Sequence, residues 1–330
     1  MNKKIEIIAE IAQGYEGKKK LLNQLTNEAI NLDVNGIKFQ LVYADELATR
    51  DYKYYKLFKS LEMPINDWMI ISKKIRNKKE LYFDIFGEKS LKIAKKLKAD
   101  GVKLSTTEFY NENLIIKSLK FFKKVILSIG GLPIDEIKRL EKKILHKYKK
   151  KIILIYGLQS EPTEIFQNNF LKLKALMYEF KNYKFAFMDH SHGGKHEALY
   201  TSLLALGNGI NMIEKHFTLD RKKKIEDYIS GLTKNKFKKF INIIRFYERS
   251  LGSYSFELSD QEKLYAKKAL KVVVAKKNLK KGKKITNQDL VLKRIGSSSL
   301  YCMYKIENIV GKKINREVRM DQPIFKRYIK

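Results

Sequence analysis

The segment KIEIIAEIAQ, residues 4–13, is the first of eight short runs, rich in β-branched or aromatic residues, on which the fold of this chain depends. These runs alternate along the chain with amphipathic helical stretches, which indicates parallel βαβ units whose strands are buried on both faces. The other seven runs are GIKFQLV (36–42), LYFDIFG (81–87), GVKLSTT (101–107), KVILSIGG (124–131), KIILIYGLQ (151–159), YKFAFMDH (183–190) and NMIEKHFT (211–218).

The helical stretches between these runs are clearest at residues 19–32, 90–99, 133–148 and 196–207. Eight strand–helix units in about 220 residues match the number and length of a (β/α)₈ barrel. A doubly wound sheet is the alternative, but no glycine-rich phosphate-binding sequence follows the first run. We therefore predict an α/β fold, a (β/α)₈ TIM barrel, over residues 1–252.

The pattern changes after residue 252. Residues 253–268 are predicted to be a linker, and residues 269–330 to form a second, small β-rich domain. This last segment begins ALKVVVAKKNLKKGKKITNQDLVLKRIG, which is strand-rich and has a turn signal at Gly282.

The formal net charge of +33 raises the question of nucleic-acid binding. Only ten of the 69 basic residues are arginine, which is the preferred bidentate partner of phosphate and guanine. The lysines are dispersed along the whole chain. We therefore predict no nucleic-acid partner, and expect the positive field to attract small anionic substrates.

Other features of the composition bear on the compartment. The single cysteine, Cys302, excludes a disulfide within these 330 residues and fits a reducing environment. No uncharged apolar stretch approaches the roughly 18 residues of a membrane span. The apolar run near the N-terminus is short and contains Glu6 and Glu10, so it does not match a signal peptide. We expect a cytoplasmic protein with no membrane partner.

In (β/α)₈ barrels the chemistry lies at the C-terminal ends of the strands. The polar residues expected at these ends are Glu10, Gln13, Lys38, Gln40, Lys103, Thr106, Glu108, Ser128, Gln159, Asp189, His190 and His216. Thr106 or Ser128 alone could simply cap a following helix. A lysine on an apolar strand must find an anion or suffer a large desolvation cost. Lys38 and Lys103, converging with Glu10, therefore predict a pocket for an anionic substrate.

The segment MDHSHGGKHE (188–197) contains three of the five histidines. His190 ends the seventh predicted strand, and His216 ends the eighth. Because adjacent strands lie about 4.8 Å apart, these two imidazoles can share one ion. His192 and His196 lie further along the loop, where we expect them to be mostly solvated.

Taken together, the segments resemble the N-acetylneuraminate (sialic acid) synthase family, in which a (β/α)₈ barrel carries a C-terminal antifreeze-like, or SAF, domain. The matching segments are EIAQGYEG (10–17), IKFQ (37–40), KLSTTE (103–108), ILSIGG (126–131), MDH (188–190), IEKHFTLDR (213–221), IEDYISG (225–231) and LKRIG (292–296). The resemblance covers nearly the whole chain and implies that residues 269–330 are the SAF domain.

The resemblance implies a reaction of sialic acid biosynthesis: phosphoenolpyruvate condenses with the open-chain aldehyde of an N-acyl amino sugar such as N-acetylmannosamine, and phosphate is released. It implies that Glu10 is the catalytic acid/base, and that a divalent ion, Mn²⁺ or Mg²⁺, is bound by His190 and His216 as a Lewis acid. The residues implied to bind phosphoenolpyruvate are Lys38, Lys103, Thr106, Ser128 and Gln159. Those implied to contact the sugar are Glu108, Glu161, Asp227 and Arg294. It also implies a homodimer in which each SAF domain caps the partner's barrel and brings Arg294 to it.

The chain departs from the family pattern at three places. DIFGE (84–88) stands where a Ser-Thr-Pro-Phe element that helps to hold phosphate is more usual, and Met188 replaces a serine. QSEPT (159–163) places Glu161 where an aromatic sugar contact is expected. Two alternatives therefore stay open: a related phosphoenolpyruvate aldol synthase that makes another keto-sugar acid, and a catalytically degenerate barrel that binds anions or polysaccharide.

Overall fold

The computed structural model describes residues 4–296 and 302–330. The chain divides into two compact units, one up to residue 253 and the other from residue 254.

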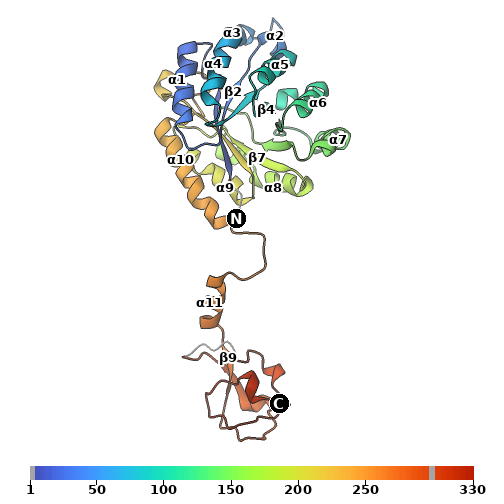
Figure 1. Cartoon of the computed structure of the whole chain (residues 1–330), viewed down its shortest axis with the longest axis vertical. Helices are drawn as coiled ribbons and strands as arrows, with labels where there is room; N and C mark the ends of the chain where they lie inside the picture. The colour runs from blue at the N-terminus through green and yellow to red at the C-terminus, as the bar shows by residue number, and fades with distance from the viewer. Residues whose placement is uncertain (1–3, 297–301) are drawn as a thin grey trace. The chain divides into compact units, whose positions relative to one another are not determined.

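In the first unit, eight parallel strands close into a barrel in the order β1 to β8 (Figure 1). The strands are β1 (Glu6–Ala12), β2 (Gly36–Gln40), β3 (Glu80–Asp84), β4 (Gly101–Leu104), β5 (Lys124–Ser128), β6 (Ile152–Tyr156), β7 (Lys184–Asp189) and β8 (Met212–His216). The barrel closes where β1 pairs with β8, in a register that sets Glu10 beside His216. The predicted (β/α)₈ barrel is therefore confirmed, and the doubly wound sheet is excluded.

Helices surround the barrel (Figure 1). They are α1 (Lys19–Ile30), α2 (Ala44–Leu47), α3 (Tyr55–Ser60), α4 (Ile65–Ile75), α5 (Glu88–Lys96), α6 (Glu112–Phe121), α7 (Ile134–Lys143), α8 (Phe170–Glu179), α9 (Thr201–Gly207) and α10 (Lys234–Tyr247). The helix expected over 196–207 is divided into a 3₁₀ turn, Glu197–Leu199, and α9. No helix within the described residues is long and apolar enough to cross a membrane.

The main hydrophobic core lies between the strands and the helices. Apolar residues recur every three or four positions on the helices, as in α1, which buries Leu22, Leu25 and Ala29. On α4, the ring of Trp68 packs edge-on against Phe39 and Phe83, which lie on β2 and β3, with ring centroids 5.5 Å apart in both pairs. This packing fixes the outward faces of the strands, so that their alternate residues face inward.

The side chains that face the barrel interior change from apolar to polar toward the C-terminal ends of the strands. A separate apolar cluster fills the interior, formed by Ile8, Tyr82, Ile126, Ile153, Ile155, Ala186, Met188 and Met212. Two positions further toward the C-terminal ends, the same faces carry polar residues, such as Glu10 after Ile8 and Asp84 after Tyr82. The apolar cluster therefore forms the layer of the barrel interior that lies directly below the polar site.

The first helix of the second unit is α11 (Asp260–Ala269), which lies largely in the segment predicted to be a linker. Its first turn is closed by a capping box between Ser259 and Glu262. The small domain that follows pairs β9 (Val272–Ala275) with β10 (Leu290–Lys293) in an antiparallel sheet. Its small core consists of Val273, Ala275, Leu279, Ile285, Leu290, Ile309, Ile314, Val318 and Ile324. The predicted β-rich domain is therefore confirmed.

Candidate active site

A cavity of about 200 Å³ lies at the C-terminal ends of the barrel strands. Its lining is entirely polar and consists of Glu10, Lys38, Gln40, Asp84, Lys103, Gln159, Glu161, His190, Glu214, His216 and Asp227. Eight of the twelve site residues expected from the sequence are in this set. Asp84 and Glu214 were not expected.

One half of the cavity is a lysine cluster formed by Glu10, Lys38, Asp84, Lys103 and Glu214, all of them buried. Lys38 Nζ lies 2.9 Å from Asp84 Oδ1 and 3.5 Å from Glu214 Oε2, and it also pairs with Glu10. Lys103 Nζ lies 2.6 Å from Glu214 Oε1 and 3.8 Å from Asp84 Oδ2. Each lysine therefore has carboxylate partners within the protein itself.

Within the lysine cluster, the pKa values of the members are shifted in different directions. Burial is the main cause that raises the pKa of Glu10 to about 8; Lys38 opposes it, and Glu214 and Asp84 add to it. Burial alone would lower the pKa of Lys38, but Asp84, Glu10 and Glu214 together raise it. Burial would likewise raise the pKa of Glu214, but Lys103 and Lys38 hold it below its ordinary value. Glu10 is thus the member that can hold a proton near neutral pH.

The other half of the cavity contains two buried histidines at the ends of β7 and β8. The rings of His190 and His216 lie 4.9 Å apart between centroids and are inclined at 52°. Nδ1 of each ring is buried and has no hydrogen-bond partner in the described parts of the chain. Burial, with the nearby charge of Lys103, lowers the pKa of His190 to about 4, and burial next to His190 holds the pKa of His216 well below its ordinary value. Both rings are therefore neutral at pH 7, which is the form that binds metal ions.

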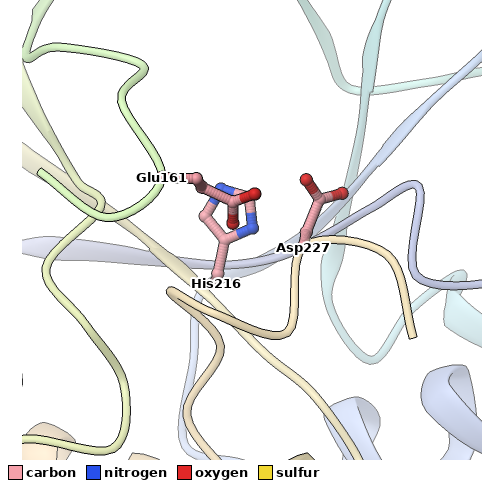
Figure 2. Close-up of side chains that lie close together, drawn as sticks. All are labelled: Glu161, His216 and Asp227. Atoms are coloured by element: carbon pink, nitrogen blue, oxygen red, sulfur yellow. The ribbon is translucent and has the colours of Figure 1, made fainter. Parts of the chain in front are cut away.

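Two carboxylates lie close to His216 (Figure 2). Glu161, His216 and Asp227 each offer one ligand atom, and these atoms all lie within 4.8 Å of one another. The backbone N–H of Gln13 donates to Asp227 Oδ2 at 2.9 Å. Burial, followed by the charge of Glu161, raises the pKa of Asp227 to about 7. These two carboxylates and the two histidines form what we call the metal cluster, and their imidazole and carboxylate donors fit a divalent ion.

A buried ion pair lies next to the metal cluster but outside the cavity. Asp189 and Lys215 each precede a histidine of the cluster, and their charged atoms lie 2.9 Å apart. Asp189 also accepts hydrogen bonds from the backbone N–H of Ser191 at 2.9 Å and from Ser202 Oγ at 2.7 Å. Asp189 does not line the cavity, so this predicted strand-end residue positions β7 and β8 and does not face a ligand.

Three expected substrate contacts do not line the cavity. Thr106 Oγ1 lies 2.9 Å from Ser128 Oγ and donates to the carbonyl of Gly130 at 3.2 Å. Glu108 accepts a hydrogen bond from Asn111 at 3.0 Å and is also buried. Their roles toward phosphate and sugar stay predictions.

Three further residues named from the sequence lie away from the cavity lining. Arg294 is exposed in the second unit, where its Nε donates to the carbonyl of Ala269 at 3.2 Å. His192 is half-buried and accepts a hydrogen bond from the backbone N–H of Gly194 at 3.1 Å. His196 is exposed and stacks on Tyr200. Neither of these histidines joins the metal cluster.

Comparison with known proteins gives relatives over nearly the full chain. A protein of Methanocaldococcus jannaschii, named only as uncharacterized, is 28% identical over 97% of this chain and 93% of its own length. The N,N'-diacetyllegionaminic acid synthase of Legionella pneumophila is 24% identical over 94% of this chain and 90% of its own. Among solved structures, an N-acetylneuraminic acid (sialic acid) synthetase from Leptospira borgpetersenii, in complex with citrate, superposes with a TM-score of 0.74 at 24% identity, over 82% of this chain and 93% of that one.

Family models account for both units. The model described as chaperone for flagella basal body P-ring formation matches residues 270–330, which is the SAF domain. The model of the NeuB family matches residues 25–255, more than half of the chain and nearly all of the barrel. The resemblance to sialic acid synthases is thereby confirmed, and the chain belongs to the NeuB family.

Proposed function

We propose that this protein is a nonulosonic acid synthase, which condenses phosphoenolpyruvate with the open-chain aldehyde of an N-acyl amino sugar and releases phosphate. One observation carries the proposal: a single polar cavity joins two buried lysines and Glu10 to two buried, neutral histidines. The lysines suit an anion, and the histidines suit a divalent ion. The acid synthases among the relatives support the same reaction.

In the lysine cluster, Lys38 and Lys103 would bind the carboxylate and phosphate of phosphoenolpyruvate. Asp84 and Glu214 pair with the lysines and keep the buried positive charges compensated when no substrate is bound. Glu10 would handle the proton of the water that adds to the substrate, because burial places its pKa at about 8, close to neutral pH.

The sugar would bind on the side of the metal cluster. His190 and His216 would hold the divalent ion, Mn²⁺ or Mg²⁺, which when bound supplies a Lewis acid for the aldehyde oxygen. Gln159 lines the cavity and would contact phosphoenolpyruvate. Glu108 and Arg294 are proposed sugar contacts, as expected from the family resemblance.

The proposed reaction forms one C–C bond and one C–O bond, and it breaks the C–O bond between C2 and the phosphate group. C3 of phosphoenolpyruvate attacks the aldehyde carbon, and the aldehyde oxygen takes up a proton to become a hydroxyl group. Water adds at C2 and loses one proton, which balances the proton taken up by the aldehyde oxygen. The C2–O bond to phosphate then breaks, C2 becomes the keto group, and the second proton of the water leaves with the phosphate. Glu10 lines the cavity and would accept and return protons in these steps.

The test is phosphate release from phosphoenolpyruvate with a panel of N-acyl hexosamines, with and without Mn²⁺, followed by mass spectrometry of the product. We expect release that depends on both the sugar and the ion, and a product whose mass equals the sum of the sugar and pyruvate. Absence of any condensed product across the panel would refute the proposal.

A second candidate is a related phosphoenolpyruvate aldol synthase that acts on a different aldose. Glu161 favours it, because this carboxylate lines the cavity at the position where the family resemblance predicts an aromatic sugar contact. A panel that also contains simple pentoses and hexoses separates the two candidates by which aldehyde gives condensed product.

We propose in addition that the active form is a homodimer in which Arg294 reaches the partner's cavity. Tyr254 and Phe256 at the start of the second unit are fully exposed apolar side chains, which are suited to an interface. Mixing Arg294→Ala chains with Glu10→Gln chains should restore part of the activity, because one site of each mixed dimer is intact. Light scattering that shows a monomer, or mixed dimers without activity, would refute this arrangement.

A further inference from the structure

The arrangement of Glu161, His216 and Asp227 is compact enough for one ion (Figure 2). Glu161 lies in the loop after β6, His216 ends β8, and Asp227 lies in the loop after β8. Their ligand atoms all lie within 4.8 Å of one another. Two oxygens each about 2.1 Å from one ion are at most about 4.2 Å apart, so a shift of less than about 1 Å brings the three atoms to a common ion.

A second observation points to a ligand at the same place. His190 lies next to His216, and Nδ1 of each buried ring lacks a hydrogen-bond partner among the residues described. Buried polar atoms in folded proteins nearly always have a partner. Both rings line the cavity together with Glu161 and Asp227, so a bound ion would supply what the protein does not.

The loop that carries Glu161 is fastened to the strand that carries His190. Ser230 Oγ, from the loop that also carries Asp227, donates to the carbonyl of His190 at 2.9 Å. The backbone N–H of Thr163 donates to the same carbonyl at 3.0 Å. Asp227 is oriented by the bond from Gln13 to Oδ2, which leaves Oδ1 available.

We propose that Glu161 is a metal ligand, and that with His190, His216 and Asp227 it forms a site that binds a divalent transition ion before any substrate is present. Two carboxylates offset the charge of the ion, so no substrate anion is needed to hold it. Two imidazole nitrogens favour Mn²⁺ over Mg²⁺, which prefers oxygen ligands. The use of this ion in catalysis rests on the proposed function, but its binding depends only on the four side chains.

The test measures Mn²⁺ binding to the chelator-treated full-length protein without substrates, by loss of the electron paramagnetic resonance signal of free Mn²⁺. We expect one site per chain and a dissociation constant that rises at least about tenfold in Glu161→Gln, the lower end of what partners of a metal site contribute. Glu164→Gln makes the same charge change at an exposed position of the same loop and should bind as the wild type does.

Thermal unfolding checks that the variant is folded. Without metal, Glu161→Gln should melt as the wild type does, since this side chain is exposed; Mn²⁺ should raise the Tm of the wild type and of Glu164→Gln by more than that of Glu161→Gln. If Glu161→Gln does not fold, Glu161→Ala replaces it in both measurements.

Three results would overturn the proposal: Mn²⁺ binding by Glu161→Gln within twofold of wild type, no Mn²⁺ binding by the wild type alone, or equal affinity for Mg²⁺. Mn²⁺ binding that depends on Glu161, in a protein that gives no condensed product, would overturn only the proposed function. Condensation by a protein whose Mn²⁺ affinity is insensitive to Glu161 would overturn only this inference.

Discussion

The two halves of the cavity differ in the partners that the protein provides for their buried polar groups. In the lysine cluster, both lysines have carboxylate partners: Lys38 lies 2.9 Å from Asp84, and Lys103 lies 2.6 Å from Glu214. In the metal cluster, by contrast, the buried rings of His190 and His216 each have one nitrogen without a hydrogen-bond partner in residues 4–296 and 302–330. The first half balances its buried charges by ion pairs within the protein, whereas these ring nitrogens of the second half have no such pairing among the described residues.

This difference follows from what each group loses on burial. A buried ammonium without an anion is so costly that it would lose its proton, so the lysines need carboxylates even when the site is empty. A neutral imidazole is much cheaper to bury, and it can remain available for an ion. The lysine cluster should therefore govern stability as well as binding, and the metal cluster should govern mainly activity.

The largest effect expected is loss of activity when the metal cluster is broken. His216→Ala removes a ligand and with it the alignment of the aldehyde, so phosphate release should fall by several orders of magnitude. His196→Ala, which removes an exposed histidine of the loop after β7, is the matched control and should retain activity. A His216→Ala enzyme with wild-type turnover would refute the metal role of this histidine.

The next effect concerns the acid/base in the lysine cluster. Glu10→Gln keeps the size of the side chain and removes its ability to exchange a proton, so kcat should fall by about 10²- to 10⁴-fold. The KM for phosphoenolpyruvate should change little. If KM rises while kcat is retained, Glu10 serves to position the lysines and not to transfer protons.

A smaller effect is expected on stability, where breaking an ion pair of the lysine cluster should cost more free energy of unfolding than breaking a surface ion pair. Lys103→Met leaves Glu214 with only the more distant Lys38, so the free energy of unfolding should drop by about 3–5 kcal/mol. Lys138→Met breaks an exposed pair with Glu179 in the same barrel and should cost at most about 1 kcal/mol.

Urea unfolding measures both variants. Adding Glu214→Gln to Lys103→Met should recover part of the loss, because it removes the stranded charge. If Lys103→Met is no less stable than Lys138→Met, then the buried ion pairs of the lysine cluster do not stabilise the barrel as described.

The fold could be predicted because the sequence patterns that indicate it lie within single strands and helices. Strands buried on both faces, such as β6, are continuous apolar runs, and eight of them alternating with helices leave few topologies. The helix over 196–207 was less predictable, since the loop after β7 forms a 3₁₀ turn before α9 begins. Nothing in the local periodicity distinguishes these two forms of helix at a short segment.

The site was predictable only where strand position alone decides it. Lys38 and His216 lie on strands, and alternation of side chains places them inward. The same alternation could have identified Asp84, two residues after the inward Tyr82, and Glu214, two residues before His216. Glu161 is different, because its place beside His216 depends on contacts between loops that are distant in the sequence.

The smallest effect is a pH dependence of stability that belongs to Glu10. Burial raises the pKa of Glu10 from 4.5 to about 8, so between these values the folded protein keeps a proton that the unfolded chain has lost. The stability contributed by Glu10 is therefore fully present below pH 4.5 and is lost as the pH rises through about 8. Glu10→Gln cannot titrate, so its Tm minus that of the wild type should increase between pH 5 and pH 8. The wild type loses about 3 kcal/mol of stability over this range, which corresponds to about 6–12 °C for a domain of this size. Metal-free protein without substrate is used, and Glu164→Gln, an exposed change of the same kind, is the control. A difference that stays constant over this range would mean that Glu10 is ionised throughout, with Lys38 as its permanent partner, and the lysine cluster would then hold no exchangeable proton.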